Sequence, residues 1–275
     1  MESTLEPVQP VKPPAPHMGG KSLLADRIVD RIEGIPHTLY AEPFIGMGGV
    51  FLRRRYKPAC EVINDLDGEL VTFFRILQRH YTPFLEMLRY QITSRAEFDR
   101  LKACAPSTLT DLERAARFLY LQKTAFGGKR AGQTFGVNFD APARFDITTL
   151  VPALEAVHER LARVLIENRP WQDLVKVYDR EGALFYLDPP YWGGENDYGK
   201  GMFARDDFER ISEALSGISG KFLLSINDVP EIREIFSDFK IDAVKTRYSV
   251  GKDANQEVGE LLITNYTEPP VNRLL

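Results

Sequence analysis

The sequence has only two cysteines, Cys60 and Cys104, and four histidines, so neither a disulfide framework nor a zinc site is expected. No apolar run approaches the roughly 18 residues that a membrane helix needs, and the N-terminal residues lack the apolar stretch of a secretory signal. Positive charge is also scarce, because 35 Lys and Arg face 39 Asp and Glu. A net charge of -4 excludes a general polyanion binder, so any nucleic-acid surface must be local. These absences favour a cytoplasmic protein that binds neither a metal nor a membrane.

The apolar content is ordinary: 44% of the 275 residues are hydrophobic, enough for a sizeable core. Residues 1–16 differ from the rest, because they hold five prolines and little that could be buried. We interpret them as an extended, mobile tail.

After this tail, short apolar segments alternate with helical patterns. The predicted strands are 38–44, 60–64, 164–168, 183–187, 221–226, 241–245 and 259–265. The predicted helices between them begin at Ser22, a candidate cap, and at 50, 66, 154, 171, 206 and 229. This order predicts an α/β fold with a parallel sheet covered by helices. Residues 81–148 interrupt the alternation with helix-like stretches at 83–89, 96–102 and 112–122, and we interpret them as an inserted helical subdomain.

The most specific motif is Asp188-Pro189-Pro190-Tyr191, which directly follows the continuous apolar run 183–187. Ligand sites in open α/β sheets lie at the carboxyl ends of strands, so this position suits a functional site. By average residue usage, a chain of this length contains these four letters by chance on the order of once in a thousand. The alternative is a plain turn, since two prolines end a strand in any case.

Together with other segments, this tetrapeptide resembles the Dam-like, or D12, class of adenine-N6 DNA methyltransferases. The resemblance extends from Gly19 to about Asn265. The segments that carry it, in order, are Gly19-Gly20-Lys21, Phe44-Ile45-Gly46-Met47-Gly48-Gly49, Asn64-Asp65, the insertion, and Asp188 to Tyr191.

The resemblance implies a Rossmann-like S-adenosylmethionine-dependent fold, with a mostly parallel seven-stranded sheet whose last strand is antiparallel. Residues 17–80 and 149–275 would form the catalytic, cofactor-binding domain, and residues 81–148 the target-recognition insertion. The cofactor is expected to contact His17, Lys21, Pro43, Phe44, Gly46, Gly48, Gly49, Asp65 and Asp188. His17 departs from the family, which often has an aromatic residue there. Arg169-Pro170-Trp171 replaces an acidic-aromatic pair of some members, which leaves Trp171 as either a pocket or a core residue.

The chemistry of adenine explains the catalytic role expected of Asp188, Pro189, Pro190 and Tyr191. The exocyclic amine is a poor nucleophile because its lone pair is delocalised into the ring. The Asp188 carboxylate and the Pro189 carbonyl can each accept one of its hydrogens and aim the lone pair at the methyl donor. Pro190 stiffens the turn, and Tyr191 offers a face on which a base can stack. The base must leave the duplex, because its amine is inaccessible there.

The remaining cofactor motifs allow plainer interpretations. The glycines of 46–49 permit positive φ and close backbone approach, but such turns also precede helices that bind nothing. Asp65 follows the second strand, where a carboxylate can accept ribose hydroxyls or cap a helix. Lys21 is either near the methionine end of the cofactor or a solvated side chain.

The insertion is locally basic, since residues 112–145 hold six Lys and Arg against two acidic residues, a local charge of 6 − 2 = +4. Phe126, Phe135 and Phe139 interleave this charge, as suits contact with phosphates and bases. Lys123, Lys129 and Arg130 are the DNA-binding candidates, and a solvated loop is the alternative. Ser225-Ile226-Asn227-Asp228 ends a neighbouring strand, where it could shape the pocket or form a turn.

The sequence therefore predicts a methyltransferase that uses S-adenosylmethionine to methylate adenine N6 in double-stranded DNA, without a metal. We expect a monomer or weak dimer in the cytoplasm of a bacterial cell or phage-infected host, with or without a restriction partner. Two rivals remain: a methyltransferase acting on RNA or a protein amide, and a DNA-binding module without catalysis. Enzymes acting on glutamine amides usually have Asn in place of Asp188, which argues against the protein amide.

Overall fold

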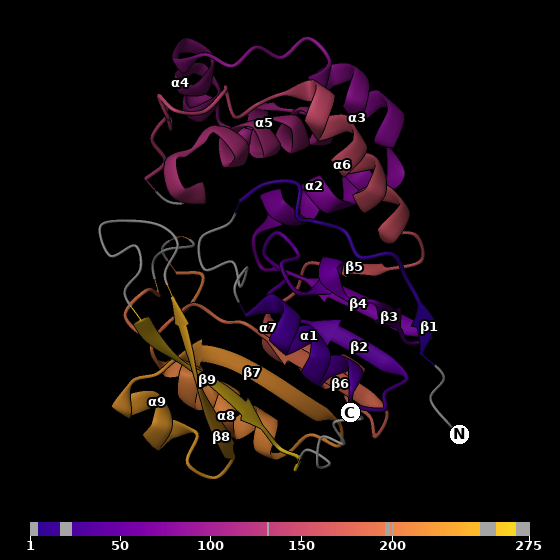
Figure 1. Cartoon of the computed structure of the whole chain (residues 1–275), viewed down its shortest axis with the longest axis vertical. Coiled ribbons are helices and arrows are strands. Elements are labelled where there is room, and N and C mark those ends of the chain that lie inside the picture. Colours follow the sequence, from indigo (N-terminus) through magenta and orange to yellow (C-terminus); the bar gives the residue numbers. More distant parts are fainter. Residues whose placement is uncertain are drawn as a thin grey trace.

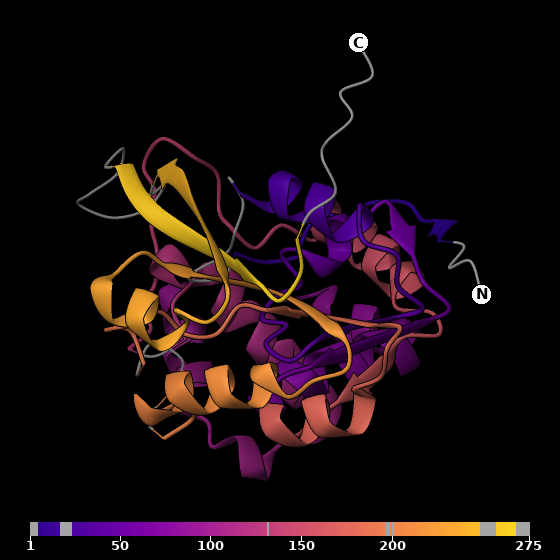
Figure 2. The same cartoon turned by 90° about the horizontal axis from the view of Figure 1, so that it is seen from below.

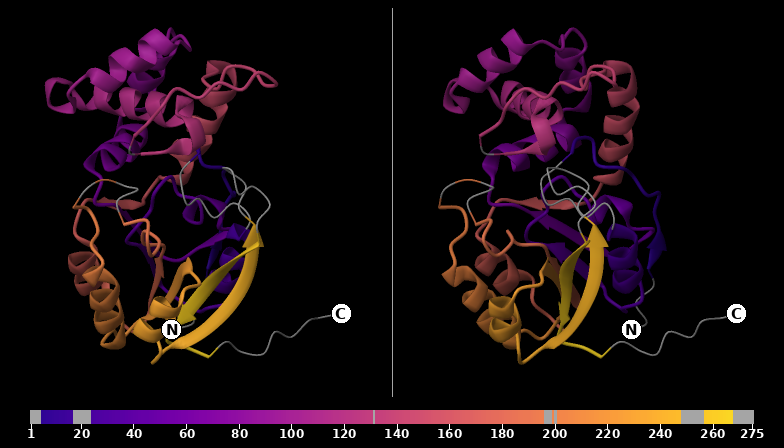
Figure 3. Two further views of the ribbon diagram at one scale, coloured as in Figure 1. Left: turned by 90° about the vertical axis from the view of Figure 1, so that its left-hand side faces the viewer. Right: turned by 60° about the vertical axis from the view of Figure 1, so that its left-hand side comes forward.

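The structure is a computed structural model that describes residues 5–16, 24–130, 132–195, 199, 201–247 and 257–267. Two lobes are stacked along the long axis, a helical lobe above and a sheet with its covering helices below (Figures 1 and 3).

The seven-stranded sheet of the lower lobe has the strand order β5-β4-β2-β6-β7-β9-β8. Its strands are β2 (Leu39–Glu42), β4 (Cys60–Asn64), β5 (Leu165–Glu167), β6 (Ala183–Leu187), β7 (Lys221–Asn227), β8 (Lys240–Arg247) and β9 (Glu257–Thr264). Neighbouring strands from β5 to β7 are parallel, whereas β9 is inserted antiparallel between β7 and β8. The predicted α/β fold, with seven strands and an antiparallel last strand, is confirmed.

Helices cover both faces of the sheet, so β6 and its neighbours are buried on both sides. One face packs against α1 (Ala25–Glu33) and α2 (Gly68–Arg79), and the other against α7 (Trp171–Tyr178), α8 (Asp206–Ser216) and α9 (Pro230–Ile235). Figure 2 shows α7 and α8 below the sheet and α1 above it. Trp171 is 6% exposed within the second of these cores, which favours its interpretation as a core residue.

The upper lobe is helical, and α2 connects it to the sheet by packing along α5. Its elements are α3 (Tyr81–Leu88), α4 (Arg95–Ala103), η2 (Pro106–Thr108), α5 (Asp111–Thr124), η3 (Phe126–Gly128) and α6 (Ile147–Arg160). Four phenylalanines form its centre: Phe73 of α2 contacts Phe74, Phe84 and Phe118 with ring centroids 5.2–6.0 Å apart. A shared aromatic core therefore packs the helices of this region against one another.

Residues 5–16 correct the expectation of a free tail. They are extended, as their prolines favour, but β1 (Glu6–Pro7) pairs antiparallel with β3 (Tyr56–Lys57). The Val11 amide donates to the Leu52 carbonyl over 2.7 Å, and Ala15 is buried. Proline lacks an amide hydrogen but keeps its carbonyl, so a proline-rich segment can still be held along a folded body.

The segment after the glycine-rich turn is a second correction. The helix predicted over 50–55 is only a single 3₁₀ turn, η1 (Phe51–Arg53), because Arg54 takes an extended backbone with ψ of 138°. This geometry turns the chain at once into β3. The predicted cap Ser22 lies outside the described residues, and α1 begins after Leu24 without a side-chain cap.

Candidate active site

The candidate site lies along one edge of the sheet, where four parallel neighbouring strands end. The order β4-β2-β6-β7 brings together the segments that follow Asn64, Glu42, Leu187 and Asn227. Because β9 runs in the opposite direction, its beginning reaches the same edge, and Glu260 of β9 is the register partner of Asn227. The topology thus gathers the predicted glycine-rich turn, Asp65 and the Asp188 turn at one place, as expected for an open α/β sheet.

The glycine-rich turn has the backbone that its sequence predicts. Gly46 and Gly48 have φ values of 49° and 75°, a region that other residues rarely adopt. A Cβ atom on Gly48 would lie 2.9 Å from Cγ of Leu52, so the turn is also too tight for a side chain there. Pro43 is buried, and its carbonyl accepts a 2.9 Å hydrogen bond from the Asn64 side chain. Phe44 packs edge-on against Phe203, 6.1 Å between ring centroids.

Asp65 connects this turn to α2. Its Oδ2 accepts the Gly46 amide over 3.1 Å, and its Oδ1 accepts the Asp67 amide over 3.0 Å. Desolvation raises the pKa of Asp65 to about 6, although these two amide donors oppose the rise. The helix cap is Asp67, which accepts the Glu69 amide, so Asp65 does not cap α2. A carboxylate has about four acceptor positions, so two remain for a ligand's hydroxyl groups.

Asp188 is half-buried at the end of β6, followed by the buried Pro189 and Pro190. Its Oδ1 accepts a 3.3 Å hydrogen bond from the Ser225 hydroxyl. The fully buried Tyr186 is hydrogen-bonded to the same hydroxyl over 2.8 Å. The hypothesis that the segment from Ser225 shapes this edge agrees with these contacts, whereas Asp228 pairs with Arg233 of α9.

Sequence reasoning missed Glu42, the last residue of β2. This carboxyl is buried, accepts the Tyr40 hydroxyl over 2.5 Å, and has a pKa raised to about 8, mainly by desolvation. The charge of Asp188 contributes to this rise, which indicates that the two carboxyls interact. A signal existed: an acidic residue followed by proline, Glu42-Pro43, closes β2, and the similar pair Asp188-Pro189 comes directly after β6.

A buried ion cluster of Glu61, Arg54 and Arg160 lies close enough to Glu42 to interact with it electrostatically. Glu61 of β4 accepts hydrogen bonds of 2.7 Å from Arg54 and Arg160. The Arg54 side chain is 0% exposed and its guanidinium lies 3.6 Å above the Tyr40 ring, while Arg160 is stacked 4.1 Å above Phe51. One carboxylate therefore compensates two buried guanidinium groups.

The three DNA-binding candidates lie near one another in sequence but differ in their contacts. Lys123 donates to the Pro14 carbonyl over 3.2 Å, and burial lowers its pKa. Arg130 is paired with Asp67 and lies 4.8 Å from the centre of the Phe118 ring. Lys129, between them, is exposed. Arg130 thereby links the insertion, through Asp67 and Asp65, to the glycine-rich turn.

The other basic residues of the insertion also make internal contacts. Arg114 pairs with Glu69 of α2 over 2.5 Å, Arg117 donates to the Leu101 carbonyl, and Arg144 donates to the Ala125 carbonyl. The local charge of +4 therefore serves mainly to hold the insertion together and to α2. DNA contact by the three candidates stays a prediction.

Two expected cofactor residues, His17 and Lys21, lie outside the described residues. Within the described ranges, no group of three His, Cys, Asp or Glu could hold a metal ion. The same ranges contain no helix with the length and hydropathy of a membrane span.

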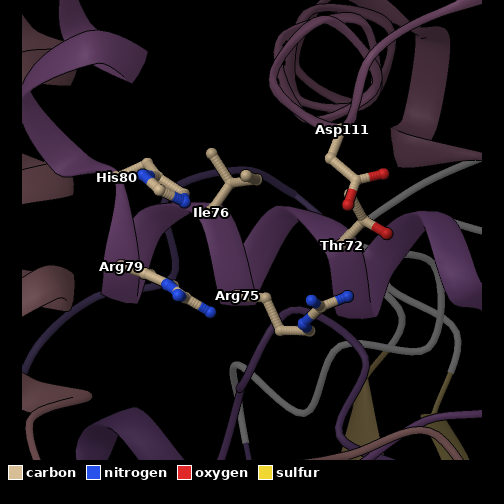
Figure 4. Close-up of a pocket in the computed structure, with 6 residues that line it drawn as sticks. All are labelled: Thr72, Arg75, Ile76, Arg79, His80 and Asp111. Atoms are coloured by element: carbon tan, nitrogen blue, oxygen red, sulfur yellow. The ribbon is translucent and has the colours of Figure 1, made fainter.

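A small pocket of about 100 Å³ lies away from the strand ends, on the second half of α2. Its lining residues are Thr72, Arg75, Ile76, Arg79, His80 and Asp111 (Figure 4). Arg75 and Arg79 project to the same side of the helix, and Asp111 comes from the start of α5. The pocket uses none of the segments at the strand ends, so it is separate from the candidate site.

Comparison with known proteins decides the family. Residues 17–250 match the D12 class of N6 adenine-specific DNA methyltransferases. The chain belongs to this family. A relative named Type II methyltransferase M.CviBI, from Paramecium bursaria Chlorella virus NC1A, is 24% identical over 93% of this chain and its own full length. Another, Type II methyltransferase M1.LlaDCHI from Lactococcus lactis subsp. cremoris, is 25% identical over 84% of this chain and 91% of its own.

Among solved structures, precorrin 8W decarboxylase from Methanobacterium thermoautotrophicum is similar to this chain; the aligned region covers 89% of this chain and 90% of that protein. Its sequence identity is 11% and its TM-score is 0.37. The family match confirms the resemblance on which the sequence prediction depends. As a D12 class member, the chain is a site-specific, adenine-specific DNA methyltransferase.

Proposed function

We propose that this D12 class enzyme transfers the methyl group of S-adenosylmethionine to N6 of an adenine rotated out of duplex DNA. The observation that carries the proposal is the arrangement at the sheet edge. The Asp188 carboxyl, the Gly46–Gly49 turn and Asp65 follow three adjacent parallel strands, β6, β2 and β4. An amine acceptor and a nucleoside-binding carboxylate therefore belong to one site.

The residues present fit S-adenosylmethionine. The positive φ of Gly46 and Gly48 forms a tight turn whose backbone a ligand can approach, and Asp65 retains acceptor positions for ribose hydroxyls beyond the two amides that it accepts. The pKa of about 6 leaves Asp65 mostly ionised at neutral pH, as an acceptor must be. When bound, the cofactor supplies an activated methyl group on a sulfonium, so the chain itself needs no covalent intermediate.

Asp188 and the Pro189 carbonyl would hold the adenine amine. The Ser225 hydroxyl donates to Oδ1 of Asp188, which helps to fix the carboxylate in the orientation in which it would accept the substrate amine. Two acceptors on one amine orient its lone pair, and positioning of this kind supplies much of the rate in transfer reactions. The Tyr191 ring would stack on the base, a contact of about 1–3 kcal/mol.

DNA is expected to lie between the insertion and the sheet edge. Arg130 pairs with Asp67 beside the cofactor turn, so the insertion is fixed next to the site that it would serve. Exposed aromatic side chains on the insertion, 97% for Phe139 and 49% for Phe126, suit contact with bases.

The proposal is tested by expressing the chain in a host that lacks DNA methylation. Sequencing with modification detection should find N6-methyladenine within one recurring sequence, and the purified protein should methylate DNA but neither RNA nor protein. Methylation of RNA or protein instead would overturn the DNA assignment. Cofactor binding without transfer to any adenine-containing DNA would favour the non-catalytic module.

Replacing Gly48 with alanine is expected to weaken S-adenosylmethionine binding by about tenfold or more. The change forces a side chain into positive φ, a strain of about 1–3 kcal/mol, and against Leu52; the turn relieves both by shifting away from the geometry that would bind the cofactor. Isothermal titration calorimetry measures the effect. Gly132→Ala is the matched control, since Gly132 has φ of +61° but no atom within 4 Å of an added Cβ. Equal cofactor affinity in the two variants would contradict the role of the turn.

Replacing Lys129 with alanine is expected to reduce the salt dependence of DNA binding, by about one unit in the slope of log K against log salt. The reason is that an exposed lysine contacting a phosphate releases one counterion. Lys176→Ala, on the exposed side of α7, is the control that should keep the slope. A slope unchanged in Lys129→Ala would remove this lysine from the DNA interface.

A further inference from the structure

The hydroxyl of Tyr191 is held by a buried acid from the far end of the chain. It donates a 2.6 Å hydrogen bond to Oε2 of Glu260, which is 2% exposed on β9. Glu260 stands immediately before the buried run 261–264. Burying a carboxylate in such a strand costs free energy unless the carboxylate is hydrogen-bonded, so the hydrogen bond from Tyr191 offsets part of this cost.

The residue opposite Glu260 holds the next part of the same turn. Asn227 of β7 is the register partner of Glu260. Its Oδ1 accepts the Trp192 amide over 2.9 Å, and its Nδ2 donates to the Trp192 carbonyl over 3.2 Å. One rung of the sheet therefore fixes the side chain of Tyr191 and the backbone of Trp192.

The geometry of a tyrosine shows what the contact with Glu260 can do. The hydroxyl lies on the axis of the χ2 rotation, so a hydrogen bond there does not set the plane of the ring. It does fix the position of the far end of the side chain, which restricts χ1 to one rotamer. Packing against the core on this face of the sheet then restricts the ring plane. A base that stacks on the ring would meet a surface already in place.

We propose that Glu260 is a positioning residue for the reaction: it holds the Tyr191 ring where the everted adenine stacks. This inference rests on the proposed function, because it assigns the ring a base to receive. Glu260 itself contacts neither base nor cofactor in this account. The sheet thus contributes three holding side chains to the catalytic turn: Ser225 for Asp188, Asn227 for Trp192, and Glu260 for Tyr191.

The test compares Glu260→Ala, Glu260→Gln, Tyr191→Phe and the double variant Tyr191→Phe/Glu260→Ala. Methyl transfer to DNA from an unmethylated host gives kcat/KM, and 2-aminopurine at the target adenine reports base eversion by fluorescence. Loss of a hydrogen bond to a charged group predicts a fall in kcat/KM of about 10- to 100-fold for Glu260→Ala. The eversion signal should fall with it, while affinity for S-adenosylmethionine stays within about threefold of the wild type, on the scale of ordinary mutational scatter.

The conservative variants separate positioning from general stability. Glu260→Gln keeps an oxygen acceptor for the tyrosine hydroxyl and should recover most of the activity and the eversion signal. Tyr191→Phe keeps the ring but loses the hydroxyl, so it should match Glu260→Ala, and the double variant should lose little more. If Glu260→Ala fails to fold, Tyr191→Phe still provides the comparison with Glu260→Gln. Glu231→Ala, an exposed position on α9, is the control expected to behave as the wild type.

Two outcomes would overturn the inference. Normal kcat/KM and eversion signals in folded Glu260→Ala would show that the contact serves stability alone. Additive losses in the double variant would show that Glu260 acts independently of Tyr191. A wild type that methylates no adenine contradicts the proposed function instead, so the two failures are distinguishable.

Discussion

Replacing Asp188 with alanine is expected to lower the rate of methyl transfer by at least about 10²-fold while the protein stays folded. The change removes the carboxylate that would accept the adenine amine, whereas Ser225 and the rest of the turn remain in place. Removing one preorganised electrostatic contact typically costs about 10²- to 10³-fold in rate. Mass spectrometry of N6-methyladenine in digested DNA measures the loss.

The control for this variant is Asp238→Ala, an exposed aspartate whose removal should leave activity unchanged. Calorimetry should find S-adenosylmethionine affinity in Asp188→Ala within a few-fold of the wild type, because Asp65 and the glycine-rich turn are intact. Retained methyl transfer in Asp188→Ala would remove this residue from the chemistry.

Replacing Glu61 with alanine is expected to destabilise the protein strongly. Its carboxylate is shared by Arg54 and Arg160, whose side chains are 0% and 2% exposed. Breaking a buried pair by removing one partner costs about 3–5 kcal/mol, because the other charge is left uncompensated. Each kcal/mol lowers Tm by about 2–4 °C in a protein of this size class. Thermal unfolding followed by circular dichroism measures the shift.

A matched control uses an exposed ion pair. Glu86 pairs with Arg89 one turn along α3, and their side chains are 56% and 59% exposed. Glu86→Ala should change the free energy of unfolding by less than about 1 kcal/mol, because solvent screens such a pair. Equal Tm shifts for Glu61→Ala and Glu86→Ala would show that the cluster does not hold the strands together.

Much of the sheet lobe could be predicted from the sequence because its signals are local. The run Ala183–Leu187 is apolar throughout and ends in Asp-Pro-Pro, so both the strand and its end were evident, and β6 has the predicted bounds. β4 also has its predicted bounds, and α7 begins at the predicted residue, Trp171. The glycines of the turn also predicted positive φ, which Gly46 and Gly48 adopt.

The errors come from contacts between distant parts of the chain. Prolines at 7 and 10 indicate an extended segment but not its pairing with 56–57. Glu61 and Arg160 are 99 residues apart, and Tyr191 and Glu260 are 69 apart, so no local pattern joins either pair. A weaker signal did exist. Glu260 is a charged residue within an apolar strand, and a buried charged group needs a hydrogen-bonding partner.

The number of Lys and Arg residues in the insertion does not by itself indicate DNA binding, for a similar reason. Arginines at 114, 117 and 144 are used to hold helices and loops together, a role that charge counting cannot distinguish from phosphate binding. Among the three DNA-binding candidates, only Lys129 is exposed, so it is the residue on which that prediction now depends.

The most direct test of the whole account is a crystal structure of the protein with target DNA and a non-reactive analogue of S-adenosylmethionine. The adenine amine should donate one hydrogen bond to Asp188 and one to the Pro189 carbonyl, with the base stacked on Tyr191. An everted adenine seated elsewhere, or an Asp188 turned away from the amine, would contradict it.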